Sequence, residues 1–199
     1  VIMVVEKIEE LHEILRVSKE VGVEPMIGMR VRLSAKGAGK WATSGGENAK
    51  FGVSTAELVQ ASETLKREGL AHTLKLIHFH VGSQVPDILT VKKAVQEAAR
   101  FYAKLRKMGF NLEFMDVGGG LGVDYDGSGR SDSSTNYSEQ EYANDIVSVL
   151  QSICDEKKIP HPDIISESGR ALVAHSTALV FDVLGTNEVT LRNFELQNV

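Results

Sequence analysis

Residues 74–80 read Leu-Lys-Leu-Ile-His-Phe-His, and residues 113–120 read Glu-Phe-Met-Asp-Val-Gly-Gly-Gly. Each stretch contains a short apolar run of strand length, and an amphipathic helix is predicted between them over Val91–Met108. Strands that are apolar on both sides and joined through a helix favour a parallel sheet covered by helices. This strand–helix–strand unit therefore predicts an α/β fold.

The same alternation continues on both sides of this unit. The remaining expected elements are strands and helices at Val1–Val5, 6–21, Met26–Leu33, 54–68, 138–153, Asp163–Glu167 and Leu179–Leu184. Ser54 with Glu57, and Ser138 with Glu141, have the spacing of capping boxes, which predicts where two of the helices begin. Gly22 is placed to end the first helix as a C′ glycine.

Two architectures fit this order of elements, an open doubly wound sheet and a piece of a (β/α)₈ barrel. A dinucleotide-binding sheet needs G-x-G-x-x-G at its first strand-to-helix turn, whereas Gly118, Gly120 and Gly122 follow a late strand at another spacing. We therefore predict a partial barrel over residues 1–178. Residues 179–199 are expected to be the start of a C-terminal β domain or a tail.

The composition is that of an ordinary folded domain, with 199 residues, 42% hydrophobic and 25% charged. A net charge of −5 argues against nucleic acid as the main partner, because no basic excess exists to neutralise phosphates. The longest purely apolar run, Val1–Val5, is too short for a membrane span. The single cysteine, Cys154, cannot form an internal disulfide, which favours the cytoplasm.

Polar residues gather where four of the predicted strands end, at the edge where parallel strands carry function. They are Arg30 and Arg32, His80 and Ser83, Asp116 and Gly118–Gly120, and Glu167, Gly169 and Arg170. We expect them to form one pocket, with His78 pointing the same way as His80. Glycine N–H groups and an arginine suit a phosphate, and Glu167, which follows two isoleucines, is expected to be partly buried.

Each of these residues also has a simpler structural interpretation. The glycine run could be a tight turn, Arg170 a surface ion pair, and His80 a core histidine. The six histidines lack zinc-site spacing, and Asp124, Asp126 and Asp132 do not complete a calcium loop, so no metal site is predicted. The residue chemistry alone indicates a phosphate-bearing cofactor or substrate in an α/β pocket.

Several motifs together resemble the biosynthetic arginine decarboxylases, which are barrel-type, alanine-racemase-like pyridoxal-phosphate decarboxylases. The motifs are Gly37–Trp41, Ser44–Glu47, Lys50–Gly52, His78–Gln84, Asp116–Tyr125 and Glu167–Arg170. The histidine and glycine motifs are shared with ornithine and diaminopimelate decarboxylases. The first three motifs, and Ser168 where relatives carry proline, are more specific to the arginine branch.

The resemblance implies a role for each matched residue. His80 would stack on the cofactor ring, and Glu167 would pair with the pyridine nitrogen, so these two are the expected catalytic residues. The cofactor phosphate would be held by Ser83, Gly118, Gly119, Gly120, Gly169 and Arg170. The substrate-associated stretch would comprise Asp116, Val117, Gly118, Gly119, Gly120, Leu121, Gly122, Val123, Asp124 and Tyr125.

The implied activity is decarboxylation of L-arginine to agmatine and CO₂ in polyamine biosynthesis, by a homodimer or tetramer, with Mg²⁺ as a family expectation. The alternatives are a sister decarboxylase of diaminopimelate, ornithine or lysine, and a non-catalytic pyridoxal-phosphate-binding relative. The family's Schiff-base lysine would lie upstream of Val1, so neither Lys40 nor Lys50 is its counterpart. Cys154 does not match the family's cross-subunit Cys–Asp pair. The 199 residues alone are therefore expected to be an inactive fragment.

Overall fold

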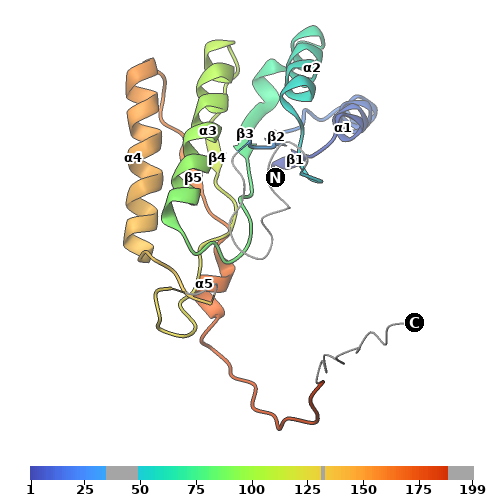
Figure 1. Ribbon diagram of the computed structural model, residues 1–199. Coiled ribbons are helices and arrows are strands. Elements are labelled where there is room, and N and C mark those ends of the chain that lie inside the picture. Colours follow the sequence, from blue (N-terminus) through green and yellow to red (C-terminus); the bar gives the residue numbers. More distant parts are fainter. Residues whose placement is uncertain (35–48, 131–132, 188–199) are drawn as a thin grey trace, which may run out of the picture.

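The computed structural model describes residues 1–34, 49–130 and 133–187 (Figure 1). The motifs Gly37–Trp41 and Ser44–Glu47 lie outside the described residues. Five parallel strands pair in chain order, and they are β1 (Met3–Val5), β2 (Ile27–Arg30), β3 (Leu74–His78), β4 (Phe114–Asp116) and β5 (Asp163–Ile165).

Each successive pair of strands is connected through a helix. These helices are α1 (Ile8–Val21), α2 (Thr55–Arg67), α3 (Ile88–Lys107) and α4 (Glu139–Lys157), with a short 3₁₀ turn, η2 (Ala71–Thr73), before β3 and a short helix, α5 (Gly169–Val173), after β5. In Figure 1 the four long helices follow one another in a row, in the same order as the strands.

The strand order distinguishes the two predicted architectures. A doubly wound sheet reverses its strand order at a switch point, whereas this sheet runs from β1 to β5 without reversal. Because crossovers between parallel strands are right-handed, an unreversed order puts all the connecting helices on one face of the sheet. The partial barrel predicted from the sequence is thus confirmed, and the doubly wound alternative is wrong.

Local hydrogen bonds explain where the helices begin and end. Both predicted capping boxes are present, with Ser54 capping α2 and Ser138 capping α4. Gly22 ends α1 in the left-handed conformation, at φ 67°. The helix α1 begins at Ile8 instead of residue 6, because the Glu10 carboxylate accepts hydrogen bonds from the backbone N–H groups of Glu6 and Lys7 at 2.7 and 3.1 Å.

The core lies between the sheet and its helices. Ile77 of β3, Met115 of β4 and Tyr102 of α3 are fully buried. The Tyr102 hydroxyl donates to the backbone oxygen of Pro160 at 3.1 Å, and burial raises the pKa of Tyr102 to about 12. Cys154 is a buried core residue, as predicted, and burial raises the pKa of its thiol.

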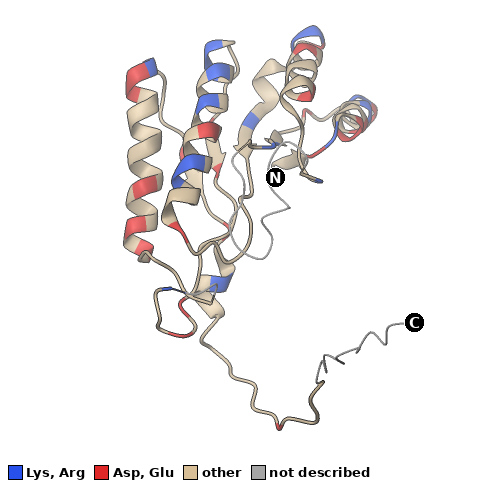
Figure 2. Ribbon diagram, in the orientation of Figure 1, with Lys and Arg blue, Asp and Glu red and all other residues tan. Residues whose placement is uncertain are grey.

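The strand predicted at Leu179–Leu184 does not form. These residues pair with no strand, and the side chains of Val180 and Leu184 are 92% and 100% exposed. The segment leads away from the sheet in Figure 1, and it is drawn almost entirely as uncharged in Figure 2. An apolar β-branched run becomes a strand only where a neighbouring backbone supplies hydrogen bonds, and none of the described residues does so here.

Four strands end earlier than predicted at their carboxyl ends. The strand β2 ends at Arg30 instead of residue 33, β3 at His78 instead of 80, β4 at Asp116 instead of 117, and β5 at Ile165 instead of 167. The residues that follow leave the sheet as loops, and these loops carry the candidate site. Within the ranges that the structure describes, none of the helices has the length and apolar character needed to cross a membrane.

Candidate functional site

Strand register places the polar residues of three strands side by side. Arg30 of β2 pairs with His78 of β3, His78 pairs with Asp116 of β4, and Asp116 pairs with Ile165 of β5. Residues paired across parallel strands share one face of the sheet, and residues two positions further along point the same way. Glu167, His80 and Gly118 therefore follow directly beyond this row, as in successive layers of a barrel.

A cavity of about 560 Å³ opens at these strand ends, which is large enough for a cofactor of ordinary size. It is lined by Arg30, Phe51, His78, His80, Gly82, Ser83 and Glu167. The cavity brings together Arg30, His78, His80, Ser83 and Glu167 of the strand-end residues expected in one pocket, and it combines the Phe51 ring and two imidazoles with cationic, anionic and hydroxyl side chains.

His80 lies just beyond β3, with its side chain partly exposed to the cavity. The Gly119 N–H donates to His80 Nδ1 at 3.3 Å, so Nδ1 is an acceptor and the ring is held in one neutral tautomer. Partial burial lowers the pKa of His80, and the charges of Arg30 and His78 lower it further, whereas Glu167 and Asp116 raise it. An uncharged imidazole can lie flat against a cationic ring without repulsion.

The glycine run 118–120 is required by close backbone packing. A Cβ at Gly118, where φ is +66°, would lie 2.3 Å from the Phe79 carbonyl oxygen, and one at Gly120 would lie 2.8 Å from the Gly82 carbonyl oxygen. Two of the three N–H groups are already used, since Gly118 donates to Asp116 Oδ1 at 2.9 Å and Gly119 donates to His80. The run thus packs one loop against another, and among the described residues no acceptor takes a hydrogen bond from the Gly120 N–H.

Arg170 and Ser83, predicted to bind the same phosphate, lie together although they are far apart in the sequence. Arg170 Nη2 donates to Ser83 Oγ at 3.0 Å, and Nη1 donates to the Tyr125 hydroxyl at 3.3 Å. Gly169 begins α5, and a Cβ there would meet nothing within 4 Å. An exposed guanidinium beside a hydroxyl and a helix's first N–H groups is an arrangement that fits a phosphate.

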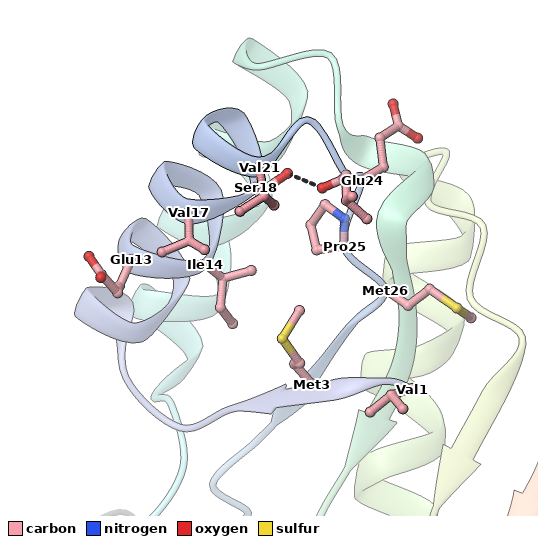
Figure 3. A pocket seen from close by; sticks show the side chains of 11 residues that line it. Val1, Met3, Glu13, Ile14, Val17, Ser18, Val21, Glu24, Pro25 and Met26 are labelled. Carbon is pink, nitrogen blue, oxygen red and sulfur yellow. Dashed lines mark hydrogen bonds between the residues drawn. The ribbon is translucent and has the colours of Figure 1, made fainter.

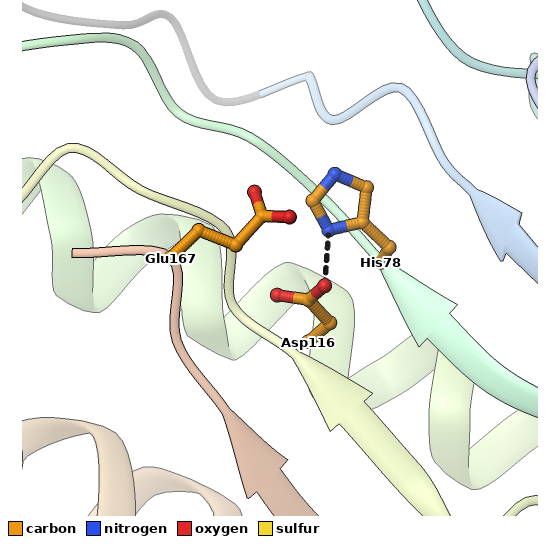
Figure 4. Close-up of side chains that lie close together, drawn as sticks. All are labelled: His78, Asp116 and Glu167. Atoms are coloured by element: carbon orange, nitrogen blue, oxygen red, sulfur yellow. Dashed lines mark ion pairs between the residues drawn. The ribbon is translucent and has the colours of Figure 1, made fainter. Parts of the chain in front are cut away.

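Glu167 was expected to be partly buried, and this expectation is wrong, because its side chain is exposed. None of the described strands pairs with the far side of β5, and Ile164 and Ile165 are themselves 41% and 37% exposed. The carboxylate nevertheless points into the cavity, toward the His78 ring (Figure 4).

Asp116 and His78 lie next to Glu167 and are both buried. His78 Nδ1 is 3.3 Å from Asp116 Oδ2, and one ligand atom from each of the three residues lies within 4.8 Å of the others (Figure 4). Such a set could receive a cation, and it could equally receive a protonated ring nitrogen. The sequence predicted no metal site. It predicted that these residues share a pocket, but it did not predict that their ligand atoms come within 4.8 Å of one another.

Arg30, expected in the pocket as a polar strand-end residue, lines the cavity. Its guanidinium forms an ion pair with Glu6 and lies 5.3 Å from the centre of the Phe51 ring. Both partners come from loops at the strand ends, and Phe51 also lines the cavity. The register of β2 with β3 places Arg30 beside His78, which the sequence alone does not reveal.

The predicted substrate stretch 116–125 divides into two parts. Val117 and Val123 have buried side chains, whereas Tyr125 is 48% exposed and contacts Arg170. Asp124 Oδ1 accepts from the Gly127 N–H at 2.8 Å and from the Ser134 hydroxyl, which stabilises the loop that follows. A role in substrate binding stays a prediction for this stretch.

A second cavity, of about 580 Å³, lies between α1 and the amino-terminal side of the sheet. In Figure 3 its lining is largely apolar, and the polar Ser18 hydroxyl is used by the Val23 carbonyl oxygen, at 2.6 Å. The residues there include Met3, Ile14, Val17 and Met26. Because polar groups do not converge in this cavity, it is not a candidate catalytic or cofactor-binding site.

Comparison with known proteins agrees with the geometry of the strand-end site. Residues 1–174 match the family "pyridoxal-dependent decarboxylase, pyridoxal binding domain". The biosynthetic arginine decarboxylase of Geobacter sp. (strain M21) is 56% identical over 190 residues, and that of Bacteroides thetaiotaomicron is 52% identical over 188 residues. These alignments cover 95% and 94% of this chain, and the chain spans about 30% of each relative's length.

Solved structures show the same architecture. The biosynthetic arginine decarboxylase of Campylobacter jejuni superposes with a TM-score of 0.73 at 40% identity, over 85% of this chain and 26% of that one. Diaminopimelate decarboxylase of Helicobacter pylori, complexed with L-lysine, superposes at 0.72 with 29% identity, over 86% and 40%. The chain therefore belongs to the family of pyridoxal-binding barrel domains of the pyridoxal-dependent decarboxylases.

Proposed function

We propose that the full-length protein containing this chain decarboxylates L-arginine to agmatine and CO₂, with pyridoxal phosphate as cofactor, and so supplies polyamine biosynthesis. The observation that carries the proposal is that His80, Ser83 and Glu167 line one cavity at the strand ends, where Arg170 donates a hydrogen bond to Ser83. The identity of up to 56% to relatives named biosynthetic arginine decarboxylase supports arginine as the substrate.

The site residues divide the work of holding the cofactor. Arg170, Ser83 and the Gly120 N–H would hold the phosphate at one end, while Glu167 would face the ring nitrogen at the other. With its phosphate and its ring nitrogen both held, the cofactor ring would have a single orientation in the cavity. When bound, pyridoxal phosphate supplies an electron sink for the electron pair that CO₂ leaves behind.

Glu167 would hold a proton on the ring nitrogen, because a carboxylate beside a ring nitrogen favours its protonated form. His80 would cover one face of the ring and exclude water from it. Its lowered pKa keeps it uncharged near neutral pH, so it does not oppose the positive charge that Glu167 maintains.

Several further features are part of the same proposal. Residues 1–178 would form the cofactor-binding part of the barrel and residues 179–199 the start of a C-terminal β domain or a tail. We propose a cytoplasmic homo-oligomer, a dimer or tetramer, with residues 116–125 near the substrate. The chain spans about 30% of the length of its relatives, which supports a Schiff-base lysine outside these residues.

The full-length protein should be incubated with pyridoxal phosphate and, separately, arginine, ornithine, lysine and diaminopimelate, with CO₂ and amine quantified. We expect agmatine from arginine and little product from the others. Product from another amino acid would assign the protein to a sister decarboxylase. Cofactor binding without any CO₂ would support the non-catalytic alternative.

In the same experiment Arg170→Ala should weaken pyridoxal-phosphate binding by about tenfold to a hundredfold, since a charge-assisted hydrogen bond contributes roughly 1.5–3 kcal/mol. Equilibrium dialysis measures the affinity. Arg100→Ala, which removes an exposed arginine of α3, is the matched control and should leave the affinity unchanged. Equal affinities for both variants would contradict the phosphate assignment.

A further inference from the structure

His78 is a buried side chain, 8% exposed, whose ring nitrogen Nδ1 makes no hydrogen bond to the described residues. The Nδ1 atom lies 3.3 Å from Asp116 Oδ2, within ion-pair distance when the ring is protonated. Buried polar atoms are nearly always paired, so an unpaired one calls for a partner that the site acquires in use. The proposed function assigns no task to His78.

The surroundings of Nδ1 show that it is a donor. It lies between two carboxylates, Asp116 and Glu167, with ligand atoms of all three residues within 4.8 Å (Figure 4). A nitrogen lone pair facing two carboxylates would be repelled by both, so the hydrogen of the ring belongs on Nδ1. The two negative carboxylates would also repel one another without a hydrogen between them.

Asp116 is anchored, whereas Glu167 is not. Asp116 Oδ1 accepts the Gly118 N–H at 2.9 Å, which leaves Oδ2 facing His78. Across residues 1–34, 49–130 and 133–187, no group donates a hydrogen bond to the Glu167 carboxylate. Arg30, a cation lining the same cavity, is already paired with Glu6. His78 is therefore the donor placed to fix Glu167.

We propose that His78, supported by Asp116, is a positioning residue whose Nδ1–H holds the Glu167 carboxylate toward the ring nitrogen of the cofactor. This inference rests on the proposed function, because it deepens the role of Glu167 there. The shared hydrogen offsets the repulsion between the two carboxylates and so holds Glu167 in one orientation. His78 acts through Glu167 and does not touch the cofactor.

Three substitutions of His78 in the full-length protein separate this role from simple packing. His78→Leu removes the donor at similar volume. His78→Asn places an amide N–H close to the position of Nδ1, and His78→Gln places one further out, near Nε2. Glu167→Gln serves as the reference for a ring nitrogen without its carboxylate.

The readout is the ¹⁵N NMR signal of bound pyridoxal phosphate labelled at its ring nitrogen, which reports protonation independently of turnover. We expect the His78→Leu signal to move toward that of Glu167→Gln, and kcat for arginine to fall about tenfold to a hundredfold, as for other supporting partners of functional ligands. His78→Asn should restore much of the wild-type ¹⁵N signal and of the wild-type kcat. His78→Gln should restore little of the signal or of kcat.

An unchanged ring-nitrogen signal in folded His78→Leu would overturn the proposal, and so would equal behaviour of His78→Asn and His78→Gln. If His78→Leu does not fold, as judged by circular dichroism, the comparison of His78→Asn with His78→Gln still tests the proposal. Wild-type protein that decarboxylates arginine with an unprotonated ring nitrogen would overturn this inference and the role given to Glu167, while the proposed arginine decarboxylation would stand. Wild-type protein without turnover or cofactor binding would overturn the proposed function as well.

Discussion

The cavity has two walls that differ in how firmly they are held. The inner wall, residues 78–83 and 116–120, follows buried strands, and its backbones approach so closely that a Cβ at Gly118 would overlap a carbonyl oxygen. The edge wall, residues 165–170, follows the exposed edge strand β5, and a Cβ at Gly169 would meet nothing. The two walls contribute to the same site with very different structural constraints.

This contrast separates structural glycines from functional residues. On the inner wall, a substitution disturbs the packing of the protein as well as any ligand contact. A loss of activity there could therefore come from either cause. On the edge wall, side chains are open to solvent, and a loss of binding reports on the ligand itself. The edge wall is therefore the better place to test the cofactor assignment.

The largest effect is expected for Gly118→Ala. A left-handed φ and a 2.3 Å contact with the Phe79 carbonyl oxygen should together cost about 4 kcal/mol of unfolding free energy. Gly169→Ala, with open space around its Cβ, should change it by less than about 0.5 kcal/mol. Urea denaturation of both variants measures the difference. Equal losses would mean that the edge wall is as tightly packed in solution as the inner wall.

A smaller difference is expected within the sheet. Ile77→Ala empties a fully buried position of β3 and should cost about 3 kcal/mol. Ile164→Ala, at a position of β5 that is 41% exposed, should cost less than about 1 kcal/mol. Thermal or urea unfolding compares the two. A loss at Ile164 as large as that at Ile77 would show that another part of the protein covers β5.

The smallest effect concerns the helix caps. Ser138→Ala should cost about 1 kcal/mol, because Ser138 caps α4, whereas Ser168→Ala should cost little, because Ser168 makes no capping hydrogen bond to α5. The Ser138 backbone N–H and, to a smaller degree, the Ser138 hydroxyl donate to the Glu141 carboxylate and lower the pKa of Glu141. Alanine keeps the backbone N–H and loses the hydroxyl, so the hydroxyl's part of the Ser138→Ala penalty should be present above the ordinary glutamate pKa and should be lost as pH falls through the lowered pKa. A penalty independent of pH would contradict this account.

Much of the fold could be predicted because its signals are local. Ser54 and Ser138 identify their helix starts through residues three positions away, and Gly22 identifies a helix end through its own backbone. The site was predictable for a related reason, since parallel strands bring all their carboxyl ends to one edge. Ser83 and Arg170, predicted as partners, are in hydrogen-bond contact.

The predictions that were wrong depended on neighbours that the sequence does not specify. Leu179–Leu184 has the residue types of a strand, but no described backbone lies beside it. Glu167 follows two isoleucines, which suggested burial, yet β5 is an edge strand and leaves them exposed. Strand propensity and hydrophobicity show that a segment is able to form a strand or to be buried. Whether it forms one or becomes buried depends on the segments that pack beside it.

The amino-acid sequence by itself determined the parallel α/β architecture, the helix caps and the strand-end residues from which the site is built, because periodicity, capping and chain direction are properties of neighbouring residues. Only the tertiary structure decided that Arg30, His78 and Asp116 form one row, and that Glu167 faces an unpaired His78 nitrogen. Register depends on how separate strands pack, and a shift of one residue would have turned each of these side chains to the other face of the sheet.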